Sequence, residues 1–189
     1  MKILNSLLTN LRIVFLSIVI LSILYPLTIN LLGMTFWSYS ASGYLVKDKF
    51  GKYIGSSMIA QKFSNPIYVF PRPSAVDYQA NASGGSNWGS KNPELKERAE
   101  NKIKTEMSEA EGFATVDSVT SSGSGLDPFI TEDNLKLQLK RIAKLRNIEA
   151  NDIAKLLNYP ELYEIPLFEN SKIFNVLKVN LYLDQNFPQ

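Results

Sequence analysis

The stretch that decides the fold is residues 13–36, which read IVFLSIVILSILYPLTINLLGMTF. No Lys, Arg, Asp or Glu occurs in these 24 residues, nor in the ten that follow up to Val46. As an α-helix the run rises about 36 Å, and the hydrocarbon core of a bilayer is about 30 Å thick. Apolar side chains cover the whole circumference, which is typical of a helix surrounded by lipid. The sequence therefore predicts one membrane-spanning helix.

A cleaved signal peptide is the main alternative, because Lys2 and Arg12 precede the apolar run and Ser38 and Ser40 suit a weak cleavage site. The apolar region of a signal peptide is only about 7–15 residues long. A buried helix of a soluble protein fits less well, since the rest of the chain is too small to surround it. We therefore expect a retained anchor.

Flanking charges predict the orientation of this anchor. Lys2 and Arg12 lie on one side, and the first basic residue on the other side is Lys47. By the positive-inside rule, residues 1–12 form a short cytoplasmic end and residues 37–189 form one extracytoplasmic domain. The expected location is the cell (inner) membrane, crossed once.

Composition excludes several classes of function. The 189 residues contain no Cys and no His, which rules out disulfides, thiol nucleophiles, Cys/His zinc sites and triads that use His. Two of the 20 basic residues precede the anchor, so the outer part balances its 18 acidic residues and is formally neutral. A neutral domain gives no electrostatic basis for binding nucleic acid. We expect no catalytic residue and no metal site.

The residues after the anchor predict a small α+β domain. Short apolar runs between turn residues indicate strands, and the first two, on either side of Gly51, indicate a hairpin. The last strand is expected because Val179, Leu181 and Leu183 alternate with other residues. The expected strands are 44–46, 53–54, 67–70 and 176–183, and residues 116–119 form a short β-like stretch.

Three helices are expected between these strands. The first begins with Asn92 as its cap and Pro93 in its first turn, and it runs through about Glu109 to Gly112. A second begins after Thr131, and a shorter one covers about 152–157. The elements alternate without a repeating βα unit, which argues against an open parallel sheet.

Two loops rich in Gly and Ser are the least ordinary part of the domain: NASGGSNWG at 81–89 and SSGSGLDP at 121–128. Glycines at turns and Ser or Asn side chains that cap nearby backbone explain them structurally. Alternatively, their N–H groups form an anion-binding nest. A phosphate loop of the Walker type is rejected, because Ser90 precedes Lys91 and that motif has the reverse order.

Arg72 lies between two prolines just before the first loop, on a segment that these prolines make stiff. The nearest carboxylates along these segments are Asp77 and Asp127. We expect Arg72 either to pair with one of them or with a partner's carboxylate, or to be a solvated surface residue. A pair of carboxylates is also what a glycosidase uses, but no aromatic sugar platform accompanies it.

Taken in order, the motifs form a longer pattern. It comprises the anchor with Tyr25-Pro26-Leu27, then GSSMIAQ at 55–61, Arg72-Pro73-Ser74-Ala75 with Tyr78, SGGSN at 83–87 with Asn92-Pro93, SGSGLDP at 122–128, and VLKVNL at 176–181. This order closely resembles the KdpC family, the C subunits of the prokaryotic Kdp high-affinity potassium-transporting P-type ATPase complex. The resemblance covers nearly the whole chain.

The resemblance implies a non-catalytic subunit of a membrane complex. Its partners would be KdpA, a channel-like potassium-selective subunit, KdpB, the P-type ATPase subunit, and KdpF, a small single-span subunit. The C subunits are described as stabilising the complex, covering the potassium entrance and acting as a catalytic chaperone that raises the ATP affinity of KdpB. The chain then needs no cofactor of its own, and ATP, Mg²⁺ and potassium belong to the complex.

Candidate partner-contacting or functional residues follow from these loops. They are Arg72, Ser74, Asp77, Tyr78, Ser83, Gly84, Gly85, Ser86, Asn87, Ser122, Gly123, Ser124, Gly125 and Asp127. Residues 82–86 also look like the signature loop of ABC ATPases, with Ser86 in place of Gln, so direct nucleotide contact is a further hypothesis. The remaining alternative is a free-standing, membrane-anchored extracytoplasmic binding module or a carboxylate-dependent hydrolase.

Overall fold

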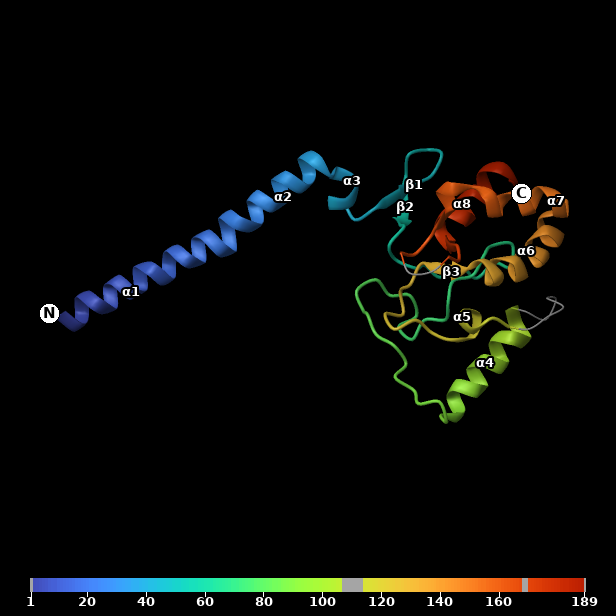
Figure 1. The fold of residues 1–189 in the computed structure, drawn as a ribbon, viewed down its shortest axis with the longest axis horizontal. Coiled ribbons are helices and arrows are strands. Elements are labelled where there is room, and N and C mark those ends of the chain that lie inside the picture. The colour runs from blue at the N-terminus through green and yellow to red at the C-terminus, as the bar shows by residue number, and fades with distance from the viewer. Residues whose placement is uncertain (1, 107–113, 168–169, 189) are drawn as a thin grey trace. The chain divides into compact units, whose positions relative to one another are not determined.

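The computed structural model describes residues 2–106, 114–167 and 170–188. The chain divides into two compact units, Met1–Leu45 and Val46–Gln189. Together they confirm the expected α+β class: a long apolar helix at the amino end and a domain of helices and small sheets (Figure 1).

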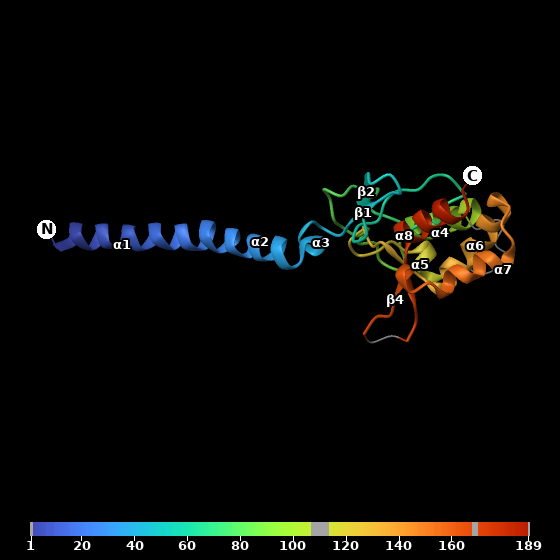
Figure 2. The same cartoon turned by 90° about the horizontal axis from the view of Figure 1, so that it is seen from above.

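The first unit is one long helix followed by a single helical turn. α1 (Lys2–Ile18), the π-helical segment η1 (Val19–Leu24) and α2 (Tyr25–Phe36) run without a break, and α3 (Ser38–Ala41) follows. The helix has 35 residues and a mean hydropathy of 2.3 over its most apolar window, with no part of that window buried. It is therefore long and apolar enough to cross a membrane, and it begins well before residue 13 (Figure 2).

The π-helical turn lies just before Pro26 and explains how the helix continues past it. A proline inside a helix lacks an N–H and crowds the carbonyl of the preceding turn. Here the N–H of Tyr25 donates to the oxygen of Ile20, five residues earlier, which is the π-helical spacing. The hydroxyl of Thr28 donates to the oxygen of Leu24 at 2.8 Å. A widened turn thus accommodates the proline.

Two small sheets occur in the rest of the described chain. β1 (Leu45–Lys47) pairs with β2 (Tyr53–Ser56), which confirms the expected hairpin around Gly51. The second sheet has the order β3-β5-β4, and both pairings are antiparallel. Its strands are β3 (Phe129–Thr131), β4 (Tyr163–Glu164) and β5 (Ile173–Asn175). This sheet was not expected from the sequence, because its strands are only two or three residues long.

The expected helices are confirmed where they are described. α4 (Pro93–Glu106) begins at the expected cap, where the N–H of Glu94 donates to Oδ1 of Asn92 at 2.9 Å. Its predicted end, near Glu109 and Gly112, lies outside the described residues. The other helical elements are α5 (Val116–Val119), α6 (Glu132–Arg146), α7 (Ala150–Ala154), η2 (Lys155–Asn158), η3 (Pro160–Leu162) and α8 (Val176–Asn186).

The predicted strand over 176–183 was wrong, because these residues form α8. Asn175 caps the helix by accepting the N–H of Lys178 at 3.1 Å. The buried residues of α8 include Val176, Val179 and Leu183, which lie on one face of a helix at spacings of three and four. The alternation read as a strand is part of this helical pattern, and the cap was overlooked.

The β-like stretch at 116–119 was also wrong and is the single-turn helix α5. Hydroxyl groups next to the turn replace the backbone partners that a strand would need. The hydroxyl of Ser118 donates to the oxygen of Thr115 at 2.6 Å, and that of Thr120 donates to the oxygen of Val116 at 2.7 Å. The two valines at 116 and 119 therefore do not indicate a strand here.

The predicted strand at 67–70 was wrong: the chain turns at 66–67, bends at Tyr68 and is irregular at 69–70, and it pairs with no strand of the described chain. Side chains of two helices take the partner's place. Asn180 of α8 accepts the N–H of Val69 at 2.8 Å and donates to its oxygen at 2.9 Å. Gln138 of α6 does the same for Phe70, at 2.8 and 3.0 Å. An amide side chain presents one donor and one acceptor, so it imitates a strand edge.

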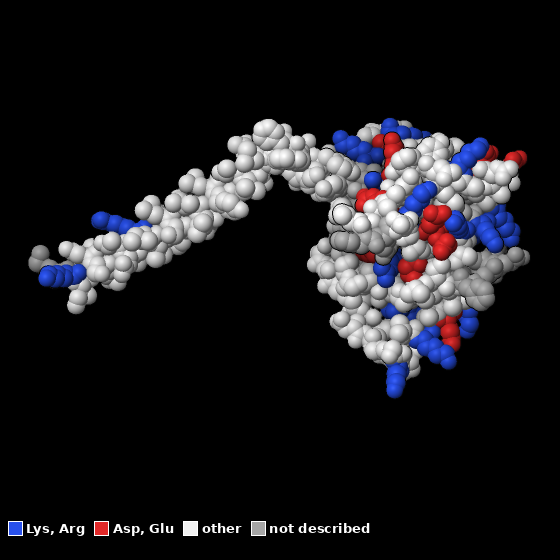
Figure 3. Space-filling model, in the orientation of Figure 1, with Lys and Arg blue, Asp and Glu red and all other residues white. Residues whose placement is uncertain are grey.

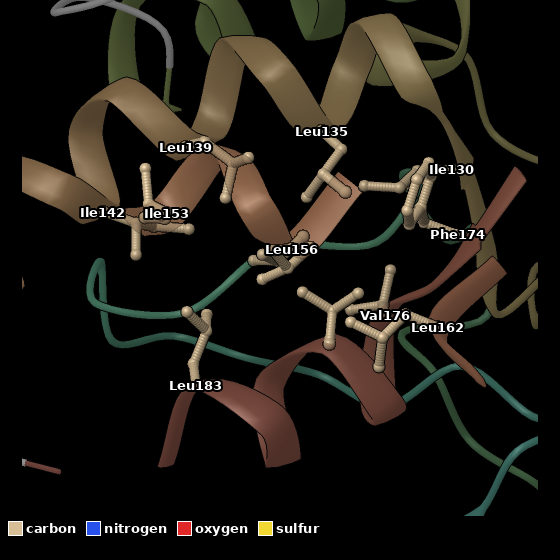
Figure 4. Close-up of a cluster of buried hydrophobic side chains, with 12 residues drawn as sticks. Ile130, Leu135, Leu139, Ile142, Ile153, Leu156, Leu162, Phe174, Val176 and Leu183 are labelled. Carbon is tan, nitrogen blue, oxygen red and sulfur yellow. The ribbon is translucent and has the colours of Figure 1, made fainter. Parts of the chain in front are cut away.

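The hydrophobic core lies between the segment around Val69, the three-stranded sheet and helices α6 and α8 (Figure 4). Its buried side chains are Val69, Ile130, Leu135, Leu139, Ile142, Ile153, Leu156, Leu162, Phe174, Val176, Val179 and Leu183. Leu135, Leu139 and Ile142 form the apolar face that the sequence predicted for α6. The core thus holds the carboxyl-terminal half together. It includes Val69 and Ile130, which lie close in sequence to Arg72 and to the loop at 121–128.

A candidate site formed by two glycine-serine loops

The segment before the first loop is a tight turn fixed by one serine. Ser74 accepts the N–H of Val76 at 3.2 Å and the N–H of Tyr78 at 3.0 Å. The phenol of Tyr78 donates back to the oxygen of Arg72 at 2.9 Å. Asp77 and Tyr78 have φ values of 50° and 58°, a conformation that non-glycine residues seldom adopt. Ser74 and Tyr78, both predicted candidates, therefore shape this turn.

The two glycine-serine loops lie side by side, although about 40 residues separate them. The N–H of Gly84 donates to the oxygen of Ser124 at 2.9 Å, and the hydroxyl of Ser83 reaches the same oxygen at 3.4 Å. Further along, the hydroxyl of Ser121 donates to that of Ser86 at 3.4 Å. The structure thus brings together the two loops that the sequence singled out separately.

Gly125 marks the point where the turn and both loops meet. Its φ is +69°, in the left-handed region. A Cβ atom there would lie 2.8 Å from both the oxygen of Gly84 and a methyl group of Val76, and 3.3 Å from the hydroxyl of Ser74. Only glycine fits this backbone and this contact. A Cβ atom on Gly85 would meet the oxygen of Gly123 at 3.3 Å, so the loop contact is close there too.

Arg72 forms an ion pair with Asp127, one of the partners expected for it. The guanidinium lies 3.1 Å from Oδ2, and the two side chains are only 27% and 29% exposed. The other oxygen of Asp127 accepts the N–H of Phe129 at 3.0 Å. Asp77 pairs instead with Lys62 at 2.7 Å, on the solvent-exposed surface. Each carboxylate therefore has its own cation, which is not the arrangement of a glycosidase pair.

Three N–H groups of the loops are bonded to other atoms of the loops. The N–H of Gly84 is bonded to Ser124, that of Gly125 donates to the oxygen of Ser122 at 3.3 Å, and that of Leu126 donates to the hydroxyl of Ser124 at 3.1 Å. An anion nest needs such groups pointing outward together. These three groups are therefore not available to an anion. Asn87 adopts a φ of 53°, as at a turn.

A hollow of about 620 Å³ lies beside Arg72, and sequence reasoning missed it. Asp117, on its wall, accepts the N–H of Thr131 at 2.9 Å and the side-chain amide of Asn134 at 3.0 Å. Burial raises the pKa of the Asp117 carboxyl, but these hydrogen bonds outweigh burial and lower that pKa below its ordinary 3.8. The only signal in the sequence was one carboxylate among the apolar residues of 116–119.

The hollow carries charges of both signs. Lys136 lies 2.7 Å from Glu132 and 3.8 Å from Asp133, and all three line it with Arg72. The hydrogen bond with Glu132 raises the pKa of Lys136. Within the described ranges, no group of three or more Asp, Glu, His or Cys residues is placed to hold a metal ion. Figure 3 shows charges of both signs over the visible face of the domain.

Comparison with known proteins gives consistent results along the chain. Residues 7–185 match the profile of the family described as KdpC: K+-transporting ATPase, c chain. The potassium-transporting ATPase KdpC subunit 2 of Staphylococcus aureus strain Mu50 is 42% identical over 186 residues, which cover 93% of this chain and 96% of that protein. The KdpC subunit of Caldanaerobacter subterraneus subsp. tengcongensis is 38% identical over 170 residues, or 87% of each chain.

A third relative, the KdpC subunit of Bacillus thuringiensis subsp. konkukian, is 35% identical over 186 residues and covers 96% of both chains. These matches include the apolar helix, the turn at Arg72 and both glycine-serine loops. The chain therefore belongs to the KdpC family, the c chain of the K+-transporting ATPase.

Proposed function

We propose that this chain is a non-catalytic accessory subunit of an ATP-driven potassium-import complex. The observation that carries the proposal is the combination of one apolar helix, long enough to span a membrane, with a domain whose two glycine-serine loops are hydrogen-bonded to each other. Such loops are suited to presenting a fixed surface to a partner. The relatives are named as subunits of a potassium-transporting ATPase, which supplies the kind of complex.

The proposed arrangement has three parts. Residues 1–12 are the cytoplasmic end, residues 13–36 cross the cell membrane once, and residues 37–189 form the extracytoplasmic domain. The positions of Lys2 and Arg12 before the apolar run support this orientation. The domain would stabilise the assembly and cover the potassium entrance of a KdpA-like subunit. KdpB-like and KdpF-like subunits would complete the complex, and ATP and Mg²⁺ would bind the ATPase subunit.

The loop cluster is the proposed contact surface. It comprises the turn at 72–78 and the loops at 83–87 and 122–127, all joined through Gly125 and the Arg72–Asp127 ion pair. Because its backbone is fixed in advance, contact with a partner costs little conformational entropy. A raised ATP affinity of the ATPase subunit would then follow indirectly, through the partner that the cluster contacts, rather than from nucleotide held by Ser83–Ser86.

Co-purification tests the proposal directly. The chain, with a carboxy-terminal tag, is expressed in its native host under potassium limitation and extracted in mild detergent. A P-type ATPase subunit and a channel-like subunit should be recovered with it in stoichiometric amounts. Recovery of the chain alone, with both subunits present but unbound in the same membranes, would refute the assignment. As a control, the Lys155→Gln variant removes an exposed ion pair with Asp152, outside the cluster, and should co-purify normally.

A further inference from the structure

The tip of the β1–β2 hairpin exposes an aromatic side chain to solvent. Phe50 is 83% exposed, and Tyr53 on the following strand is 58% exposed. Large apolar side chains that stand in solvent with charged neighbours mark contact surfaces more often than isolated exposed residues do. The tip, residues 47–53 with the sequence KDKFGKY, therefore requires an explanation that the fold does not supply.

The tip is held in one conformation by Asp48. Its carboxylate accepts the N–H of Phe50 at 2.8 Å and the N–H of Lys52 at 3.0 Å. The backbone N–H of Asp48 donates to the oxygen of Lys52 at 2.9 Å, and Gly51 turns the chain with a φ of +80°. Phe50 thus stays at the outermost point of the turn without losing further conformational entropy on binding.

Basic residues surround this aromatic side chain. Lys47, Lys49 and Lys52 are exposed, and Asp48, the one acid in the tip, is occupied with backbone N–H groups. Among the described residues, the ion pairs of the structure involve none of these three lysines. A hollow of about 280 Å³ beside the tip is lined by Lys49, Phe50 and Asp184 of α8, but Asp184 is paired with Arg146 at 2.8 Å. The tip therefore presents an excess of positive charge.

The tip also follows the apolar helix closely along the chain. Only residues 37–46 separate the end of α2 at Phe36 from Lys47. Ten residues span at most about 36 Å even when fully extended. Trp37, Tyr39 and Tyr44 lie in this connection, and such residues are common at membrane surfaces. Chain length thus keeps the tip within reach of the surface from which the helix emerges.

We propose that the hairpin tip binds the anionic surface of the membrane that anchors the chain. Phe50 enters the headgroup region, and the three lysines pair with lipid phosphates such as those of phosphatidylglycerol. An apolar side chain among lysines is the chemistry of an interfacial membrane contact, whereas lysine is depleted at protein–protein interfaces. The ammonium groups of Lys47 and Lys49 lie over the rings of Tyr53 and Phe50, at 4.8 and 5.2 Å, and form no ion pair with a described residue. This inference rests on the proposed anchoring, and it adds a second, peripheral contact that fixes the domain near the bilayer.

Fluorescent labelling can test this contact in the full chain, because the protein contains no native Cys. Three single-cysteine variants carry the same environment-sensitive dye: Ser22→Cys within the apolar run, Phe50→Cys at the tip, and Leu167→Cys in a different loop. Leu167 is the matched control, since it is an apolar side chain that is 95% exposed. Each variant is reconstituted into vesicles of phosphatidylcholine with or without phosphatidylglycerol, and lipids carrying a shallow or a deep quencher are added.

In anionic vesicles, we expect deep quenching at position 22, shallow quenching at position 50 and neither at position 167. Replacing Lys47, Lys49 and Lys52 with Gln in the Phe50→Cys background should weaken the partition of the tip into the surface at least about tenfold. The tip with its three lysines intact should partition similarly weakly into vesicles of phosphatidylcholine alone.

Each other outcome overturns the inference in a recognisable way. Quenching at 22 without quenching at 50 would leave the anchor in place and remove the tip contact. Equal quenching at 50 and 167 would show that the dye itself enters the lipid, whatever the loop that carries it. A dye at 50 that is shielded only when the other subunits are present would identify a protein partner instead of lipid. Absence of quenching at 22 would contradict the anchor itself.

Discussion

Gly125 is the residue on which the loop cluster depends most clearly. A Gly125→Ala substitution places a Cβ atom 2.8 Å from the oxygen of Gly84 in a left-handed backbone. Strain and the forced movement of the loop should together cost about 2–4 kcal/mol of unfolding free energy. Urea unfolding of the full chain in detergent, followed by circular dichroism, measures this.

The control is Gly123→Ala in the same loop, where a Cβ atom would meet nothing within 4 Å. We expect it to change the unfolding free energy by less than about 1 kcal/mol. Similar losses for the two variants would show that the close contact at Gly125 does not matter to the fold.

The ion pair between Arg72 and Asp127 should contribute a measurable but modest coupling. Both side chains are a little over one quarter exposed, so solvent screens part of their attraction. A double-mutant cycle with Arg72→Gln and Asp127→Asn should give a coupling free energy of about 1 kcal/mol. The same cycle on the exposed pair Lys62 and Asp77 should give close to zero, and an equal value there would contradict the special position of Arg72.

Asp117 should make the stability of the domain depend on acid pH. Its pKa in the folded protein lies below the ordinary 3.8, so its contribution is present above that value. This contribution is lost as the pH falls through the folded-state pKa. Asp117→Asn should flatten the acid limb of a plot of unfolding free energy against pH, and it should lower stability at pH 7 by about 1–3 kcal/mol. An unchanged acid limb would assign the effect to other carboxylates.

Among the elements, the irregular segment 66–70 is held by side chains of α6 and α8 instead of by a strand. Arg141 binds the oxygens of Pro66 and Tyr68, and Arg146 donates to the oxygen of Ile67 at 3.0 Å. Together with the two amide pairs described above, every carbonyl oxygen from 66 to 70 is bonded by a side chain. Unpaired buried carbonyls would be costly, so these polar residues are structural.

Asn180→Ala should therefore destabilise the protein more than a typical surface change. It leaves the N–H and the oxygen of Val69 buried without partners, at an expected cost of about 2–4 kcal/mol in unfolding free energy. Asn186→Ala on the same helix is the matched control, because Asn186 is exposed and bonds only to its own helix. Equal losses in urea unfolding would indicate that the effect comes from α8 itself.

The elements also show which features could be read from the sequence. The apolar helix and the capped helices α4 and α6 were predictable, because each has a local signal: an uninterrupted apolar run, or a cap at Asn92 or Thr131. The chain from 66 to 70 was not, since its partners Gln138 and Asn180 lie about 70 and 110 residues away. At α8 the apolar pattern fitted both the two-residue period of a strand and the 3.6-residue period of a helix. The cap at Asn175 is the local signal that distinguishes the helix.

In the candidate site too, features with a local sequence signal were predictable and contacts between distant residues were not. The composition of the loops identified residues 83–87 and 122–127, and the ion pair of Arg72 with Asp127 was among the expected alternatives. That the loops contact each other at Gly84 and Ser124 was not foreseeable, because their contact depends on tertiary structure. Asp117 was missed for the same reason, since its partners Thr131 and Asn134 belong to β3 and α6.

In the whole molecule, we expect the apolar helix to be necessary for assembly. A chain lacking residues 1–36 but exported by a cleavable signal should not co-purify with a P-type ATPase subunit from native membranes. An unrelated single-span helix of the same orientation serves as the control, and it separates membrane attachment from specific contacts of the native helix. Recovery of the intact complex with the truncated, exported chain would show that the helix is dispensable.

The most direct test of the central claim is potassium uptake at limiting external potassium in native cells that lack this chain. The full chain should restore uptake, and the exported domain without residues 1–36 should not, because the claim is that a membrane-anchored subunit completes the transporting complex. Uptake that is normal without the chain, or that the truncated domain restores fully, would contradict the assignment of this protein as a required subunit of the pump.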